Sequence, residues 1–133
     1  FYPYVQRVAL RLLDLHRTDY LGYKRAVDAA CAQLPPNLHI PFMYEAHRWG
    51  VSRFAWSIFG PADAESILRL LLKHHPIRGL VSMGAGSGYV ESVLEQVSRA
   101  LGHPLAVRAY DAAPPRHACH VPVEKGGPEA LAE

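Results

Sequence analysis

The chain has 133 residues, of which 50% are hydrophobic and 20% are charged, and its formal net charge is +2 with histidine neutral. This size suits one compact domain or part of a larger one, and the apolar content excludes wholesale disorder. Two cysteines exclude a disulfide framework and a four-cysteine zinc site, no apolar run approaches the roughly 20 residues of a membrane span, and so weak a charge does not by itself indicate nucleic-acid binding.

The N-terminal third of the sequence predicts two helices. In the first, apolar residues between Val5 and Leu15 lie near one face of a helix. The second begins after Asp19, a favourable N-cap, and its apolar stripe at helical spacing includes Cys31. A Pro-Pro pair then ends it. Because Cys31 belongs to the stripe, a buried structural thiol is favoured over a reactive one.

Residues 37–60 are rich in aromatic side chains, and their spacing does not decide between helix and strand. They form a hydrophobic core or lid, or they stack on nucleic-acid bases; the first alternative is favoured. Another helix begins at Pro61 and ends before Pro76. The adjacent His74 and His75 near its end suit the negative end of the helix dipole better than a metal site.

The most informative part of the sequence is a strand, a glycine-rich loop, a helix and a second strand. The first strand covers residues 80–83 and the second covers residues 105–110, which Asp111 follows directly. This order is typical of the opening of a Rossmann-like sheet. The loop between the first strand and the helix consists of Gly84, Ala85, Gly86, Ser87, Gly88 and Tyr89.

Each residue type in this arrangement suits the binding of a ligand. Glycines permit a tight turn and let backbone N–H groups approach a ligand, and the carboxylate of Asp111 can accept hydrogen bonds from both hydroxyls of a ribose. The spacing is G-x-G-x-G, whereas a dinucleotide fingerprint needs a further glycine where Tyr89 stands. No Gly-Lys-Ser/Thr follows, which excludes a phosphate-binding Walker loop. A nicotinamide or flavin ligand, or a glycine turn without a ligand, remain alternatives.

The G-x-G-x-G loop resembles motif I of class I S-adenosylmethionine-dependent methyltransferases. The likeness extends to FAWSI at residues 54–58, AYDAAPP at residues 109–115 and PVEKGGPEAL at residues 122–131. Together these segments resemble a group of methyltransferase-like proteins over residues 53–131. The resemblance implies S-adenosylmethionine as the cofactor, with Asp111 at its ribose and the three loop glycines at its methionine part; the loop residues 84–89 and Asp111 are thus the predicted cofactor site.

The sequence departs from this family pattern at two positions. The family usually has an acid two residues before the first glycine, where it meets the cofactor's ammonium group, and here that residue is Ser82. The group commonly has tryptophan after the glycine-tyrosine pair, and here Val90 stands there, followed by Glu91. Glu91 either supplies the missing carboxylate from the helix or is a solvated acid in its first turn. The solvated alternative is favoured.

The predicted fold class is therefore α/β: an incomplete Rossmann-like methyltransferase sheet, residues 53–133, preceded by a helical extension with an aromatic-rich connector, residues 1–52. The resemblance implies seven strands, and only two are predicted here. We therefore expect a longer protein, in which the strand at residues 80–83 is central, paired on both edges and covered on both faces. Its second neighbour would come from residues after Glu133 or from a partner chain.

The predicted function is S-adenosylmethionine-dependent methyl transfer to an unidentified acceptor, with no catalytic residue in this part of the chain. The alternative is a catalytically inactive methyltransferase-like fold that serves as a structural component of a larger assembly, such as a ribosome, including a mitochondrial one, or its assembly intermediate. The arginine bias, 11 arginines against 3 lysines, is compatible with an RNA or ribonucleoprotein partner. No membrane partner is expected, and the predicted location is intracellular.

The segment of residues 116–120 contains two histidines and a cysteine, which are donors for soft metal ions. Three donors without a distant partner pair fall short of a metal site, and a loop after the second strand is the favoured interpretation. No metal ligand is therefore predicted.

Overall fold

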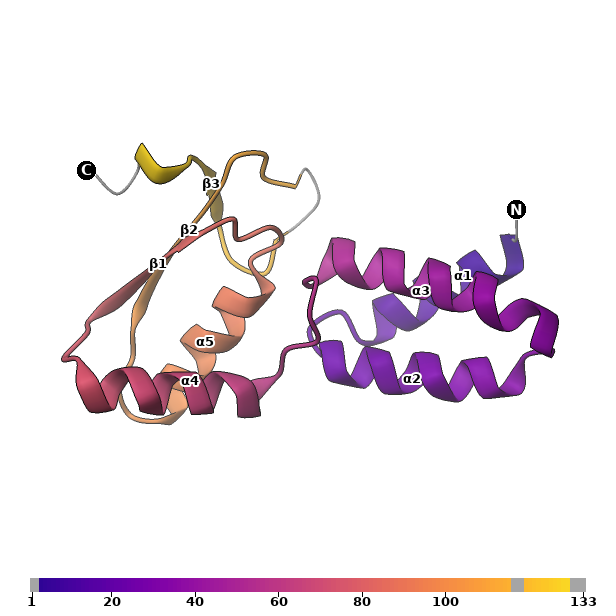
Figure 1. Cartoon of the computed structure of the whole chain (residues 1–133), viewed down its shortest axis with the longest axis horizontal. Coiled ribbons are helices and arrows are strands. Elements are labelled where there is room, and N and C mark those ends of the chain that lie inside the picture. The colour runs from indigo at the N-terminus through magenta and orange to yellow at the C-terminus, as the bar shows by residue number, and fades with distance from the viewer. Residues whose placement is uncertain (1–2, 116–118, 130–133) are drawn as a thin grey trace. The chain divides into compact units, whose positions relative to one another are not determined.

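A computed structural model of the chain describes residues 3–115 and 119–129 (Figure 1). The chain forms two compact units, Phe1–Ile58 and Phe59–Glu133. The first is helical and the second contains a parallel sheet, so the protein has a mixed α/β structure. The boundary expected between residues 52 and 53 falls at the end of the last helix of the first unit. None of the described helices is long and apolar enough to cross a membrane.

The first unit consists of α1 (Pro3–Leu15), α2 (Tyr20–Gln33), the short 3-10 turn η1 (Pro36–Leu38) and α3 (His39–Arg53). The carboxylate of Asp19 accepts a hydrogen bond from the Gly22 N–H at 2.9 Å, as expected for the N-cap of α2. The structure makes the aromatic segment a helix, α3, which the sequence left undecided. The buried core of the first unit is apolar and lies between the three helices. It includes Val5, Ala9, Leu13, Val27, Phe42 and Ala46.

Aromatic rings close the core of the first unit where the chain leaves α3. The ring of Tyr20 stacks on that of Phe54 with 4.5 Å between centroids, and the Tyr20 hydroxyl donates to the Ala55 carbonyl. Trp56, by contrast, is 84% exposed. The aromatics of this segment therefore divide between core and surface, and the predicted core role holds for only some of them.

The second unit consists of α4 (Pro61–His74), β1 (Gly79–Met83), α5 (Tyr89–Ala100), β2 (Ala106–Asp111) and β3 (Val123–Lys125). The strands are parallel and lie in the order β1-β2-β3. The strands expected at residues 80–83 and 105–110 are confirmed within one residue at each end. The sequence did not predict β3, so the described residues contain three strands where two were expected.

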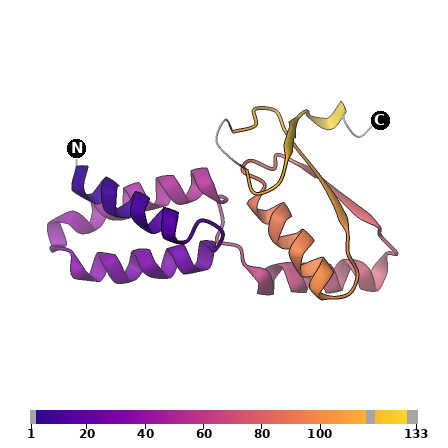
Figure 2. The ribbon, with the colours of Figure 1, turned by 180° about the vertical axis from the view of Figure 1, so that it is seen from behind.

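Helices α4 and α5 lie on one side of the sheet, and the described chain leaves its other side open (Figures 1 and 2). Val81 in the middle of β1 is accordingly 52% exposed, and β1 is an edge strand of the described sheet. Coverage of β1 on both faces was expected for a longer protein, and the described residues cover only one face. The physical reason is that α4 and α5 lie on the same side of the sheet and pack against each other.

Burial of Tyr23 makes the stability of the first unit depend on pH. Burial, together with the neighbouring Tyr20, raises the pKa of Tyr23 from 10.0 to about 12, and its hydroxyl donates to the Ala46 carbonyl at 2.7 Å. The unfolded chain releases this proton near pH 10 and the folded chain only near pH 12. The contribution of Tyr23 to stability is therefore complete below pH 10 and is lost as the pH rises to 12.

We expect Tyr23→Phe to lower stability at neutral pH by about 1 kcal/mol, because one buried hydrogen bond is removed. The loss of stability between pH 10 and 12 should also become shallower in the variant. Urea denaturation followed by tryptophan fluorescence measures both effects, because Trp49 and Trp56 are the chain's two tryptophans and both lie in the first unit. If stability falls equally steeply above pH 10 in the variant and in the unaltered chain, the raised pKa of Tyr23 does not cause this pH dependence.

Candidate functional site

The three glycines of the predicted loop all have left-handed backbone conformations. The φ angles are +69° at Gly84, +57° at Gly86 and +75° at Gly88. Only glycine adopts such angles without steric cost, so the chain can turn from β1 into α5 within six residues only because glycine occupies these positions. The expected positive φ in this loop is thus confirmed at all three glycines.

The surroundings separate these glycines into two kinds. A Cβ atom on Gly84 or Gly86 would meet no other atom within 4 Å, whereas one on Gly88 would lie 2.7 Å from the Cγ2 atom of Val121. A larger residue at position 88 would therefore collide with the segment just before β3, so that this position requires glycine. Gly84 and Gly86 instead border open space, where a ligand can approach the backbone closely.

Asp111 and the loop are joined by a direct hydrogen bond. The Gly86 N–H donates to Oδ2 of Asp111 at 2.9 Å, and the Ala113 N–H donates to Oδ1 at 2.9 Å. A carboxylate has about four acceptor positions, so two remain for hydroxyl hydrogens. The carboxyl ends of the adjacent parallel strands β1 and β2 meet at this edge, which brings the loop and Asp111 together as the sequence predicted.

Other N–H groups of the loop are also occupied within the protein. The Ala85 N–H donates to the Tyr110 carbonyl at 3.0 Å, and the Gly88 N–H donates to the Ala85 carbonyl at 2.9 Å. With Gly86 committed to Asp111, three of the loop's donors point to protein acceptors. A phosphate group would find these donors already engaged, and this disfavours a phosphate-binding loop.

Ser87 and Tyr89 lie on the buried side of the loop. Ser87 is 4% exposed, and its carbonyl accepts a hydrogen bond from the His120 N–H at 3.0 Å. Tyr89 is 3% exposed, its hydroxyl donates to the Phe59 carbonyl at 3.0 Å, and its ring meets that of His120 edge-on. These two predicted site residues hold the loop between the segment that precedes α4 and the segment before β3.

Glu91 is buried, and the expectation of a solvated acid is wrong. The residue is only 6% exposed, and its Oε1 accepts a hydrogen bond from the Ser82 hydroxyl at 2.7 Å. The second oxygen, Oε2, is also buried and has no hydrogen-bond partner among the described residues. Burial results from the register of α5 on the sheet, which faces this first-turn acid toward β1 instead of toward water.

The sequence noted Ser82 and Glu91 separately but did not predict that they touch. The signal was present in their spacing: a side chain on the covered face of β1 and one in the first turn of the next helix lie on opposite sides of a single tight turn. The sequence indicates this pair because Ser82 stands where the family usually has an acid, and Glu91 provides an acid in the following helix.

The described residues contain no group of three or more histidine, cysteine, aspartate or glutamate side chains that could hold a metal ion. Of the histidine- and cysteine-containing segment, residues 116–118 lie outside the described part of the chain. Cys119, which the structure does describe, is partly buried, as is Cys31 in α2.

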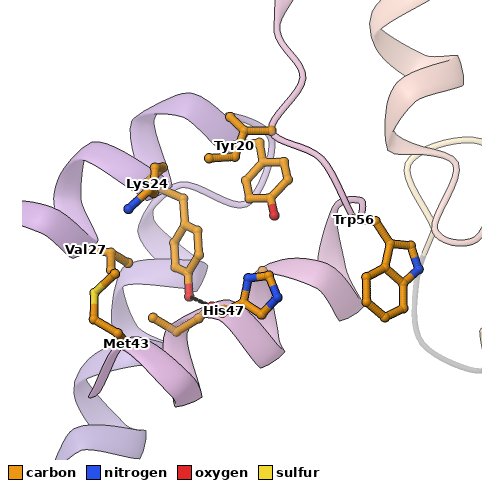
Figure 3. Close-up of a pocket in the computed structure, with 10 residues that line it drawn as sticks. Tyr20, Lys24, Val27, Met43, His47 and Trp56 are labelled. Atoms are coloured by element: carbon orange, nitrogen blue, oxygen red, sulfur yellow. Dashed lines mark hydrogen bonds between the residues drawn. The ribbon is translucent and has the colours of Figure 1, made fainter. Parts of the chain in front are cut away.

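A pocket with a volume of about 180 Å³ lies within the first unit (Figure 3). Its walls come from α2, α3 and the segment after α3, and Figure 3 shows Tyr20, Met43 and Trp56 around it. Two of the polar groups at its wall serve the fold: the Tyr23 hydroxyl donates to a backbone carbonyl, and Lys24 pairs with Asp28 at 2.6 Å. The imidazole of His47 also lines the pocket (Figure 3). One imidazole in a mainly apolar wall is a weaker indication of a ligand than the glycine loop with Asp111, so the loop is the better candidate site.

Comparisons of the chain with family models, curated proteins and solved structures found no match. The functional interpretation therefore depends on the residues and the geometry described above.

The role of Val121 against Gly88 can be tested by a pair of alanine substitutions. Gly88 and Gly102 share a φ of +75°, but a Cβ on Gly102 would meet nothing within 4 Å. We expect Gly102→Ala to lower the free energy of unfolding by about 1–2 kcal/mol for its backbone conformation alone. Gly88→Ala should cost about 1 kcal/mol more, because its Cβ also overlaps Val121.

Urea denaturation followed by circular dichroism compares the two variants with the unaltered chain. Equal losses in the two variants would show that the segment before β3 does not press on the loop, and would contradict this contact.

Proposed function

We propose that the second unit is part of a Rossmann-like methyltransferase fold and binds S-adenosylmethionine at the glycine loop. The observation that carries this proposal is the hydrogen bond between the Gly86 N–H and Asp111, which joins the loop after β1 to the acid after β2. The open backbone at Gly84 and Gly86 and the unoccupied acceptor positions of Asp111 therefore lie side by side.

The residues present fit the parts of this cofactor. The open backbone at Gly84 and Gly86 admits its methionine part, and the free acceptor positions of Asp111 suit the two ribose hydroxyls. The committed loop donors favour a ligand without phosphate over a nicotinamide or flavin dinucleotide. Gly88, Ser87 and Tyr89 support the loop from its buried side, so their part in binding is to hold its shape.

When bound, the cofactor supplies an electrophilic methyl group on a sulfonium. The chain's contribution is to orient this group: Asp111 fixes the ribose end, and the loop backbone fixes the other end. We assign no catalytic residue within the chain.

A structural role in a larger assembly is the second candidate. The open face of the sheet supports it, because Val81 is exposed in the middle of β1 and β1 leaves one edge unpaired within the described chain. Apolar exposure of this kind is usually covered by further protein. The two candidates differ in one measurable property, since only the first requires binding of the cofactor.

Isothermal titration calorimetry of the chain with S-adenosylhomocysteine, the demethylated product, tests the first candidate. We expect binding by the unaltered chain and a loss of about 1–3 kcal/mol of binding free energy in Asp111→Ala, because charged hydrogen-bond acceptors are removed. Glu124→Gln is the matched control, because Glu124 is an exposed carboxylate of the same sheet and should leave the affinity unchanged.

No binding by the unaltered chain would overturn the cofactor proposal and favour the structural role. An equal loss in Asp111→Ala and Glu124→Gln would remove Asp111 from the site.

A further inference from the structure

The carboxylate of Glu91 is the most unusual polar group in the second unit. Glu91 is only 6% exposed, yet its carboxylate receives one hydrogen bond from the described residues, from the Ser82 hydroxyl to Oε1. Oε2 is buried without a partner among the described residues. A buried carboxylate oxygen without a hydrogen-bond partner is unfavourable, so a site of this kind calls for a partner that the described residues do not supply.

Cationic side chains of the described residues do not supply that partner. Among the described residues of the second unit, the ion pairs are Arg69 with Glu65 and Arg99 with Glu95, both on exposed helix surfaces. Arg108 lies over the ring of Tyr110. A cation brought by a ligand would therefore complete the pair.

Glu91 lies beside the glycine loop for reasons of connectivity. Ser82, its partner, precedes Gly84 by two residues, and Glu91 follows Gly88 within the first turn of α5. The end of β1 and the start of α5, which flank the glycine loop, therefore place Ser82 and the buried carboxylate of Glu91 beside it.

We infer that Glu91, oriented by Ser82, binds the ammonium group of the ligand's amino-acid part; this inference rests on the proposed function. S-adenosylmethionine carries two positive groups, the ammonium and the sulfonium. Only the ammonium has N–H donors that can satisfy the unpartnered oxygen, and a charge-assisted hydrogen bond is the strong form of this contact. The Ser82 hydroxyl occupies Oε1 and so leaves Oε2 as the acceptor for the amine.

Three ligands distinguish the two positive groups. S-adenosylmethionine has both, S-adenosylhomocysteine keeps the ammonium but has a neutral sulfur, and 5′-methylthioadenosine lacks the amino-acid part altogether. Calorimetry of the full chain with each ligand is compared between the unaltered protein, Glu91→Gln and Glu95→Gln. Glu95 is the matched control because it is a partly exposed acid one turn later on the same helix, paired with Arg99.

We expect Glu91→Gln to weaken S-adenosylmethionine and S-adenosylhomocysteine by a similar factor of about ten or more, and to leave 5′-methylthioadenosine unchanged. Glu95→Gln should change none of the three affinities. The double variant Ser82→Asp/Glu91→Gln, which moves the carboxylate to the strand side of the same contact, should recover most of the loss.

The other outcomes overturn the inference in distinguishable ways. A loss restricted to S-adenosylmethionine would assign Glu91 to the sulfonium, and an equal loss for all three ligands, with a lowered melting temperature, would assign it to the fold. No loss for any ligand would remove Glu91 from the site. If the unaltered chain binds none of the three, the proposed function fails and the inference fails with it.

Discussion

The hydrogen bond from the Gly86 N–H to the Asp111 carboxylate determines the geometry of the second unit's open edge. It links residues 25 positions apart, and it does so where the adjacent parallel strands β1 and β2 both end. The bond requires a loop that turns back sharply after β1, and the left-handed backbone at Gly84, Gly86 and Gly88 provides that turn. Any ligand at this edge meets a carboxylate whose position is already fixed.

This arrangement has a consequence for ligand chemistry. A glycine loop at a helix N-terminus often binds phosphate through its free N–H groups. Here the donors of Ala85, Gly86 and Gly88 are engaged by protein acceptors, while acceptor positions on Asp111 and on Glu91 remain open. Three loop donors are thus engaged while acceptor positions stay open, which favours a ligand that brings hydroxyl and amine hydrogens over one that brings anionic oxygens.

The parts of this structure that the sequence predicted are those in which local chemistry decides. Left-handed φ angles demand glycine, so the spacing of Gly84, Gly86 and Gly88 indicated the loop. The position of Asp111 followed because parallel strands end at a common edge.

The parts that the sequence did not predict depend on tertiary contacts. The aromatic spacing before residue 54 is compatible with helix and strand, and packing on α1 and α2 decides for α3. The three residues of β3 are too few for a periodic signal and form a strand because β2 offers them a neighbour. Glu91 looks like an ordinary first-turn acid until the fold sets it against Ser82.

The most direct test of the central claim is a titration of the chain with S-adenosylhomocysteine, followed by two-dimensional NMR of the backbone amides. We predict that the largest chemical-shift changes occur at Gly84, Gly86 and Asp111 and in the first turn of α5. The amide signals of α1, α2 and α3 should not shift. An absence of shifts, or shifts concentrated around the pocket of the first unit, would contradict the assignment of the glycine loop as the ligand site.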